Sequence, residues 1–369
     1  MATEVKGLNM DTKDRITTTE VIIIVVNYVL AAGVFTLPRT TVEQAGTPDV
    51  WISVIIGGLV SMIMGLIIAR LSQRFPGQTV YQYSRKIIGR PLAILLGVVL
   101  IGYFVCIASY EMRTVQEVTV FFLLEGTPNW AITGIFMWVA LYLCRGGINA
   151  VSRMCRLMIP ITWTVFFGVC LLSLQIVDIN NLRPVLGQGM SPVWRSVKPT
   201  ALTFTSGEAL LFLVAFMDKP KKTMKVVVSA TLIAMVFYIV AVVLCIGAFS
   251  VDGVVTRTWP FIDLIRSFEV NYLVFERFES LWLTIWIMQI FCTFCIAFYG
   301  AALGLSQLTK IPLNHCLFTL LPVIYIVTES PRNLNGLFAF GSGIGNWSMI
   351  LFGALPLTLL IIARLRGAR

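Results

Sequence analysis

One carboxylate of this sequence stands in the middle of an apolar stretch, where a charge is least expected. Glu208 follows Gly207 near the centre of residues 199–217, which are long enough to cross a bilayer as a helix. A charged group at that depth costs at least about 2.5 kcal/mol, so it needs a partner or a proton. Glu208 could carry a coupling proton or hold an unwound segment open by accepting backbone N–H bonds. The alternative is a structural acid with satisfied hydrogen bonds.

Small residues interrupt two apolar spans about half a chain apart. One site is VLAAGVFTLP at residues 29–38, and the other is TFTSGEAL at residues 203–210. Unwound backbone at membrane depth offers free N–H groups to a carboxylate and free C=O groups to an ammonium, so we expect a ligand site there. The alternative is that the small residues only let helices pack closely, as Gly300 and Gly304 of a G-x-x-x-G would.

Polar side chains in other spans could complete this cavity, although such groups in a bundle often only bridge helices. They are Asn27, Tyr103, Thr284 and Gln289. Trp282 and Trp286 share one helical face, which favours packing over an ammonium cage. Glu111 and Arg113 lie toward the outer end of their span, where we expect them to pair with other charges as gate or interface residues.

Residue types and spacing do not favour catalysis or metal binding. Cys292 and Cys295 form a C-x-x-C inside an apolar stretch without partner ligands, and His315 is the only histidine. The Gly341–Gly345 run matches neither a Walker loop nor a dinucleotide fingerprint, and we expect it to be a flexible loop before the last span. No nucleophile has a neighbouring base. We therefore expect no enzyme activity, no cofactor, and neither catalytic nor metal-ligating residues.

The composition is that of a polytopic membrane protein. Of the 369 residues, 57% are hydrophobic and 12% are charged, and the mean hydropathy is +0.87. We treat the chain as one transmembrane domain over residues 1–369, with 1–19 as a cytoplasmic tail and the first span as a retained helix. The expected spans are 20–41, 50–71, 91–113, 129–145, 156–177, 199–217, 225–249, 279–306, 312–328 and 346–364.

Charge sets the expected orientation. Most of the 28 basic residues fall on the side of the N-terminus, so the positive-inside rule places both termini in the cytoplasm. The net charge of +10 follows from this bias and from attraction to anionic lipid, and it requires no nucleic acid. An interfacial helix is expected between Pro76 and Pro91, and an amphipathic helix outside over residues 259–270.

The two breaks also predict how the spans are organised. Five spans separate them, and an odd number reverses the direction of the chain. Two inverted halves of five helices each, residues 20–177 and 199–364, would therefore face their broken helices toward each other at the bilayer midplane.

Several segments together resemble one family. They are ITTTEVIIIVVNYVLAAGVFTLPR, FPGQTVYQYSRKIIGRP, SGEALLFLVAFMDKPKK, and WPFIDLIRSFEV followed by FERFESLWLTIWIMQIF. They resemble the B subunit of spore germinant receptors, the endospore germination permease family of the amino acid/polyamine/organocation transporter superfamily. The resemblance implies an all-α, LeuT-like fold of about ten transmembrane helices, a 5+5 inverted repeat with discontinuous helices 1 and 6.

The resemblance also implies site residues. The broken first helix matches Ala31 to Val34 and the broken sixth helix matches Gly207 and Glu208, while the third and eighth helices would supply pocket walls. Many relatives have glycine where this chain has Ala31, and the extra methyl would shrink the pocket or change its preference. The expected ligand-binding residues are Ala31, Ala32, Gly33, Val34, Tyr103, Ile107, Thr205, Ser206, Gly207, Glu208, Thr284 and Met288.

By the same resemblance, the protein is expected in the inner membrane of a dormant spore. It would sense a small-molecule germinant, typically an L-amino acid and sometimes a sugar or nucleoside, together with an A subunit and a lipoprotein C subunit. Binding would trigger ion release and end dormancy. The alternatives are an active amino acid/proton symporter of the same fold, and an ion-channel or structural subunit with a vestigial pocket. Sensing and transport can share one pocket and differ only in the conformations populated.

Overall fold

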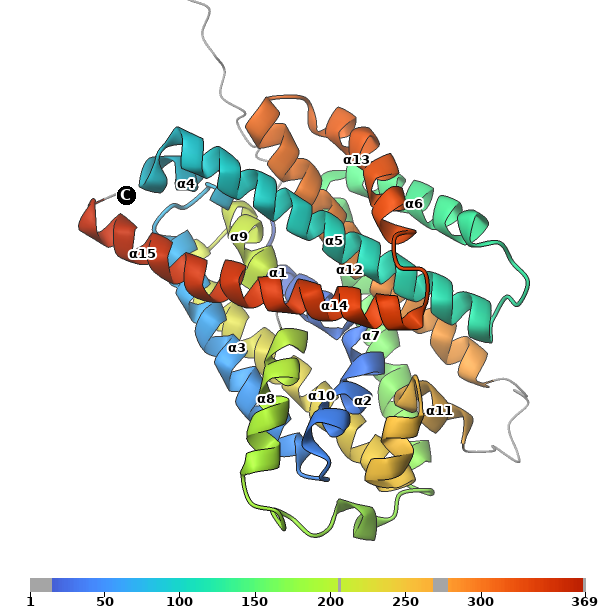
Figure 1. Ribbon diagram of the computed structural model, residues 1–369. Helices are drawn as coiled ribbons and strands as arrows, with labels where there is room; N and C mark the ends of the chain where they lie inside the picture. Colours follow the sequence, from blue (N-terminus) through green and yellow to red (C-terminus); the bar gives the residue numbers. More distant parts are fainter. Residues whose placement is uncertain (1–14, 205–206, 268–277, 368–369) are drawn as a thin grey trace, which may run out of the picture.

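The computed structural model describes residues 15–204, 207–267 and 278–367. They fold as a bundle of helices in which α1 lies at the centre (Figure 1). The first half contains α1 (Thr18–Leu30), α2 (Gly33–Ala45), α3 (Val50–Gln73), α4 (Val80–Ile88), α5 (Arg90–Phe122), α6 (Asn129–Arg145) and α7 (Gly147–Ser173). The second half contains α8 (Ser191–Thr203), α9 (Gly207–Leu213), α10 (Thr223–Thr256), α11 (Pro260–Arg266), α12 (Phe278–Thr309), α13 (Leu313–Thr328), α14 (Leu334–Ser348) and α15 (Leu355–Leu365).

These helices occupy the ten expected spans. Within the described residues, six helices are long and apolar enough to cross a membrane alone, and a seventh span is the bent pair α1 and α2. The shorter helices α6 and α13, and the pair α8 and α9, fill the other expected positions. The last span is longer than expected, because α14 and α15 are joined by a π-helical segment, Met349–Ala354.

The first span is broken where the sequence predicts. Helix α1 begins at a capping box in which Thr17 and Glu20 bond each other's backbone N–H groups. It ends at Leu30, and Ala31 and Ala32 form a turn before α2 begins at an angle of 51°. The sixth span is also discontinuous, since α8 ends at Thr203 and α9 begins at residue 207.

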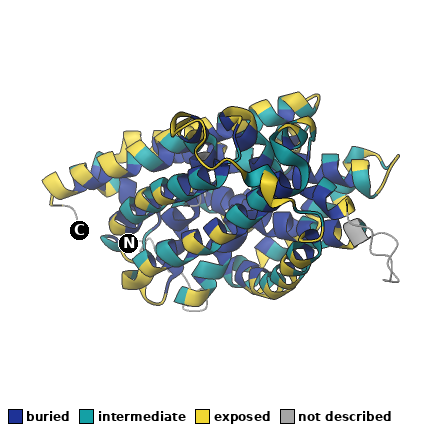
Figure 2. Ribbon diagram, turned by 90° about the horizontal axis from the view of Figure 1, so that it is seen from below, coloured by how far each residue is buried: buried dark blue, intermediate teal, exposed yellow. Residues whose placement is uncertain are grey.

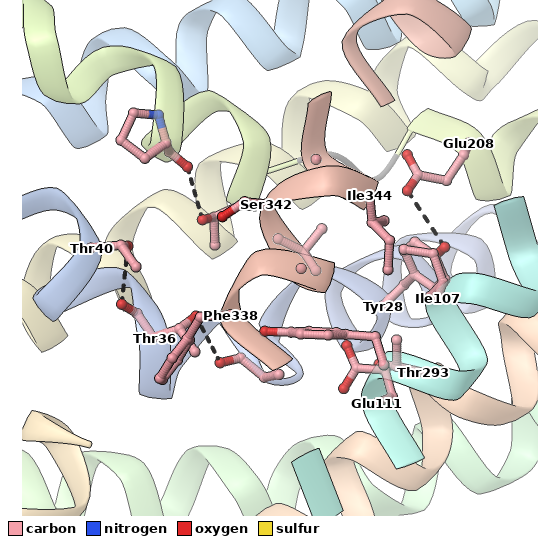
Figure 3. A pocket seen from close by; sticks show the side chains of 18 residues that line it. Tyr28, Thr36, Thr40, Ile107, Glu111, Glu208, Thr293, Phe338, Ser342 and Ile344 are labelled. Carbon is pink, nitrogen blue, oxygen red and sulfur yellow. Dashed lines mark hydrogen bonds between the residues drawn. The ribbon is translucent and has the colours of Figure 1, made fainter. Parts of the chain in front are cut away.

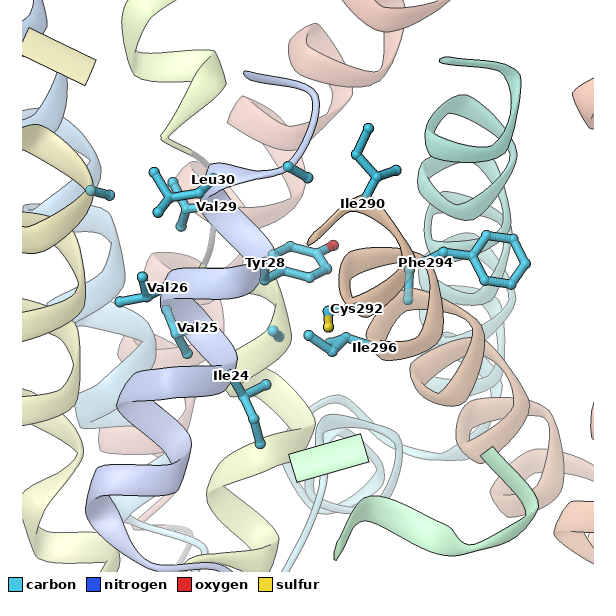
Figure 4. Close-up of a cluster of buried hydrophobic side chains, with 14 of the residues drawn as sticks. Ile24, Val25, Val26, Tyr28, Val29, Leu30, Ile290, Cys292, Phe294 and Ile296 are labelled. Atoms are coloured by element: carbon cyan, nitrogen blue, oxygen red, sulfur yellow. The ribbon is translucent and has the colours of Figure 1, made fainter. Parts of the chain in front are cut away.

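Apolar side chains hold α1 in the core of the bundle. Ile24, Val25 and Val29 of α1 are nearly completely buried, and so are Ile290 and Phe294 of the neighbouring α12 (Figure 4). Figure 2 shows buried residues gathered in the interior and exposed residues at the periphery. Many of those peripheral residues are large and apolar, as lipid contact requires.

The two amphipathic segments are helical, as predicted. Helix α4 lies between Pro76 and Pro91, and α11 covers residues 260–266. Phe261 and Leu264 of α11 are fully buried, so α11 packs into the bundle and not only on its surface. The remaining apolar position of that predicted helix, Phe268, lies outside the described residues.

The prediction of a flexible loop at Gly341–Gly345 is wrong, because these residues are part of α14. Glycine in a bilayer remains helical when the backbone has no water to bond, and it lets helices approach closely. Gly341 illustrates this, since a Cβ atom there would lie 2.7 Å from the ring of Tyr110 on α5. The same small residues place α14 beside the break in α1.

Candidate functional site

A cavity of about 200 Å³ lies beside the break in the first span (Figure 3). Five helices from both halves of the chain supply most of its wall, namely α1, α2, α5, α8 and α14. The described lining residues are Tyr28, Val29, Ala32, Gly33, Thr36, Thr40, Ile107, Tyr110, Glu111, Pro199, Thr203, Glu208, Thr293, Phe338, Gly341, Ser342, Ile344 and Gly345.

The carbonyl groups that the break leaves free are bonded by side chains from α12. The last carbonyls of a helix have no partner within it. Asn27 O accepts from Gln289 Nε2 at 3.1 Å and from Thr293 Oγ1 at 3.0 Å. Trp286 Nε1 donates to Ala31 O at 3.0 Å. Of the polar groups expected to line a cavity, Asn27 and Gln289 therefore bridge helices, and Trp286 has a polar role besides packing.

Helix α10 completes this bonding. Tyr238 donates its hydroxyl to Val29 O at 2.5 Å. The same hydroxyl lies where a Cβ atom at Gly33 would be, so Gly33 is needed for the close approach of α2 and α10. A Cβ atom at Gly207 would lie 2.7 Å from Ile68 Cδ1 of α3. Close helix packing was the alternative to ligand binding as the role of these glycines. It accounts for Gly207, whereas Gly33 both allows close packing and lines the cavity.

Glu208 is buried, and one of its oxygens is held by two tyrosines. Its side chain lies in the first turn of α9 with 1% of the residue exposed. Oε1 accepts from Tyr103 at 3.0 Å and from Tyr28 at 3.5 Å, and Figure 3 shows it pointing toward Tyr28. Oε2 has no hydrogen-bond partner among the described residues. That oxygen therefore retains its capacity to accept a hydrogen bond.

Glu111 is a second buried acid of the cavity, and its position differs from the expected one. The sequence placed it with Arg113 as a gate or interface residue, but Glu111 is 6% exposed and lines the pocket. Its carboxylate interacts with the backbone amide of Ala32, and its Oε2 has no hydrogen-bond partner in the described part of the chain. The helical spacing would have found it, because Ile107 and Glu111 are four residues apart on one face of α5.

Arg113, in contrast, pairs with other charges as predicted. Its guanidinium lies 2.7 Å from Glu117 and 3.5 Å from Glu329, and it donates to Gln116 Oε1 at 3.2 Å. Gln116 in turn donates to Glu329 Oε1 at 2.7 Å. This buried network joins α5 to the end of α13, away from the cavity.

The structure brings some of the predicted site residues to the cavity. Ala32, Gly33, Ile107 and Glu208 line it, and Tyr103 lies directly behind Glu208. Ala31 and Val34 are buried at the break and do not line the cavity, so the methyl of Ala31 does not narrow it.

Other predicted residues lie elsewhere. Thr284 is exposed on α12 and bonds its own helix at Ser280 O, and Met288 is 37% exposed one turn further along. Neither lines the cavity. Thr205 and Ser206 lie outside the described residues.

The wall contributed by α14 was not predicted. Phe338, Ser342 and Ile344 face the break from this helix (Figure 3). Thr36 and Thr40, one and two turns into α2, were also missed. Their spacing along α2 is the signal that could have found them, because Gly33, Thr36 and Thr40 follow one helical face. For α14 the glycines suggested a loop, and no pattern marked its inner face.

The cavity wall can carry charge of one sign only. Glu111 and Glu208 are the acids among the described lining residues, and neither lysine nor arginine is present there. Both acids retain an oxygen without a protein donor. Such a wall favours a ligand that carries a positive charge and N–H donors.

The sequence of the chain matches the spore germination protein family over residues 15–336. It belongs to that family. The resemblance drawn from the helix breaks and the adjoining segments is thereby confirmed. The spore germination protein YndE of Bacillus subtilis is 50% identical over 352 residues, covering 95% of this chain and 97% of that protein. The spore germination protein A2 of the same species is 33% identical, over 95% of this chain and 96% of its own length.

Solved transporter structures share the fold of this spore germination protein. The crystal structure of MhsT in complex with L-phenylalanine superposes with a TM-score of 0.68 and 11% identity, covering 93% of this chain and 97% of that one. The closed conformation of Mhp1, a nucleobase-cation-symport-1 family transporter with bound bromovinylhydantoin, gives a TM-score of 0.65 and 12% identity. This match covers 92% of this chain and 78% of Mhp1. The LeuT-like fold with broken helices 1 and 6 is therefore confirmed. The chain is a permease-like membrane protein of spore germination.

Proposed function

We propose that this chain is the germinant-sensing subunit of a spore germination receptor and that it binds an ammonium-bearing small molecule, most simply an L-amino acid. The observation that supports this is the pair of buried acids, Glu111 and Glu208, beside the unwound backbone of the first span. Each acid has one oxygen without a hydrogen-bond partner among the described residues. An ammonium group supplies three N–H donors and a positive charge, which is what two such oxygens need.

The remainder of a zwitterion also finds partners at the break. The first N–H groups of a helix have no acceptor within it and carry a partial positive charge. Helix α2 begins at Gly33, directly at the cavity. The amides of Phe35 and Thr36 donate to Ala32 O, so in our proposal the ligand places its carboxylate against the amides of Gly33 and Val34 and its ammonium between the acids.

The volume of the cavity limits the size of the ligand. About 200 Å³ is below the roughly 300–1,000 Å³ of pockets that bury drug-sized molecules. Ile107, Ile344 and Phe338 supply an apolar wall for a short side chain. A small amino acid therefore fits the proposal better than a nucleoside.

The other parts of the proposal rest on membership of the family. The receptor would reside in the inner spore membrane with both termini in the cytoplasm, and it would act with an A subunit and a lipoprotein C subunit. Ligand binding would shift the chain between conformations and so trigger ion release and germination.

The test is a germination assay with spores that carry this receptor alone. A panel of amino acids, nucleosides and sugars identifies the ligand. Spores with Glu111→Gln or Glu208→Gln should then require a much higher concentration of it, because the amide lacks the charge that pairs with ammonium. Glu125→Gln is the matched control, since Glu125 is exposed in a loop outside the cavity. An unchanged dose response in both cavity variants, with normal protein levels, would refute the proposed site.

An active amino acid/proton symporter of the same fold is the second candidate, since Mhp1, whose fold the chain shares, is a nucleobase-cation-symport-1 family transporter. Counterflow of labelled amino acid in proteoliposomes distinguishes the two. Saturable uptake by the isolated chain would favour transport, whereas binding without uptake would favour a sensor. Absence of both binding and uptake would favour a channel or structural subunit with a vestigial pocket.

A further inference from the structure

A second cavity, which we call the vestibule, adjoins the ligand pocket. It has a volume of about 460 Å³ and lies between α2, α8 and α14; in Figure 1, α2 and α8 lie below α14. Four residues line both cavities, so the vestibule and the pocket adjoin at Thr40, Pro199, Phe338 and Ser342. The other lining residues of the vestibule are Arg39, Glu43, Gln44, Arg195, Lys198, Asn335 and Asn346.

The charge of the vestibule is opposite to that of the pocket. Arg39 on α2 faces Arg195 and Lys198 on α8 across the cavity, against one acid, Glu43. Arg195 and Lys198 are three residues apart and share one helical face. Within the described residues, none of these three cations forms an ion pair at 4.0 Å or less. The vestibule therefore presents positive charge that the protein itself does not neutralise.

One aromatic ring lies at the junction of the two cavities. Phe338 of α14 lines both, and the guanidinium of Arg39 lies 5.6 Å from the centre of its ring. Trp259 packs on Phe338 with the ring centres 5.6 Å apart. These contacts hold the Arg39 guanidinium against a ring that lines both cavities.

We propose that the vestibule is a separate anion site that binds an organic carboxylate. Arginine binds carboxylates through paired N–H groups, and cations on facing walls of a cavity concentrate anions there. The side-chain amides of Asn335 and Asn346 add neutral donors from α14. If the proposed function holds, this site captures the carboxylate of a zwitterion before its ammonium reaches Glu111 and Glu208. Binding of a carboxylate in the vestibule does not itself require that the chain senses a germinant.

The test uses the full chain in nanodiscs of phosphatidylcholine, a lipid without net charge. Two probes separate the cavities by chemistry: succinate has carboxylates and no ammonium, and ethylamine has an ammonium and no carboxylate. Succinate should bind saturably, and Arg195→Gln with Lys198→Gln should weaken it on the order of three- to tenfold, as expected for two exposed charges. Binding should also weaken as salt is raised. Both residues are exposed, so the double variant is expected to fold.

A matched control removes the same charge elsewhere. Arg266→Gln with Arg332→Gln changes two exposed arginines outside the vestibule and should leave succinate binding unchanged. Absence of saturable succinate binding, or equal weakening by both double variants, would overturn the proposal. A second set of nanodiscs contains phosphatidylglycerol. The proposal would also be overturned if Arg195→Gln with Lys198→Gln lost bound phosphatidylglycerol there but kept succinate binding, because the cations would then serve lipid headgroups.

Binding of ethylamine tests the acidic pocket independently of the anion site in the vestibule. The vestibule variant should bind it as the unaltered chain does, because ethylamine lacks the anion that the vestibule recognises. Failure of the unaltered chain to bind ethylamine would count against the acidic pocket and leave the succinate result standing.

Discussion

Replacing Tyr103 by phenylalanine tests how the protein prepares Glu208 for a ligand. The substitution removes the hydroxyl that donates to Glu208 Oε1 at 3.0 Å. The ring, which packs edge-on against Phe352 with centres 4.9 Å apart, remains. The variant therefore changes one hydrogen bond and little of the packing.

The expected effect follows from the strength of that bond. A hydrogen bond to a charged group contributes about 1.5–3 kcal/mol, and about 1.4 kcal/mol is a factor of ten in affinity. Tyr103 donates this bond with or without a ligand, so only its preference for the carboxylate over the neutral acid reaches the affinity. If an ammonium binds Glu208 as a carboxylate, Tyr103→Phe should raise the dissociation constant by at most about 10- to 150-fold. Tyr28→Phe alters the same carboxylate, but that donor lies 3.5 Å away, at the limit of a hydrogen bond. Its effect should be smaller than tenfold.

The assay is the dose response of germination together with direct binding to the purified chain. Tyr325→Phe is the control, since this tyrosine is 38% exposed on α13 and distant from the cavity. The order of the two tyrosine variants is the critical result. If neither variant weakens binding, the ligand does not depend on the charge of Glu208. If Tyr28→Phe weakens binding as much as Tyr103→Phe, the distance of each donor from Glu208 does not set its effect.

Three further changes probe the packing around the site. Gly57→Ala should lower the amount of folded protein, because its Cβ would lie 2.8 Å from the backbone nitrogen of Ala201 on α8, whereas Gly102→Ala, with no neighbouring atom within 4 Å, should leave it unchanged; fluorescence-detected size-exclusion chromatography measures both. Trp286→Phe leaves the buried carbonyl of Ala31 without its donor and should cost about 1–3 kcal/mol, seen as a lower melting temperature in detergent. Arg113→Gln removes the cation from Glu117 and Glu329 and should cost about 1–3 kcal/mol, because both carboxylates are partly exposed and stay solvated; the melting temperature in detergent should fall.

The sequence predicts the breaks well because their physical cause is local. Ala31, Ala32 and Gly33 are small residues inside an apolar span, and the chain turns at them. Glu208 stands out for a similar reason, since an acid at membrane depth must lie inside the bundle. The number and order of spans follow from the lengths of apolar runs, which the bilayer fixes.

The rotation of each helix about its axis was harder to predict. Helix α12 is apolar on nearly every face, so its sequence does not indicate which side meets the pocket. Thr284 and Met288 were expected inside and lie outside, whereas Thr293 lines the cavity. Glu111 was missed for a different reason, because its place near a helix end drew attention away from the face it shares with Ile107.

The bonds that close the break in α1 bear on how tightly a small ligand can bind. The carbonyls of Asn27, Val29 and Ala31 are each bonded to a side chain of α10 or α12. The unwound backbone is therefore preorganised, and a ligand does not need to order it on binding. Immobilising flexible groups commonly costs about 0.5–1.5 kcal/mol for each side chain. A molecule of a few heavy atoms, which makes few contacts, can then bind at useful concentrations because almost none of its interaction energy is lost to ordering the receptor.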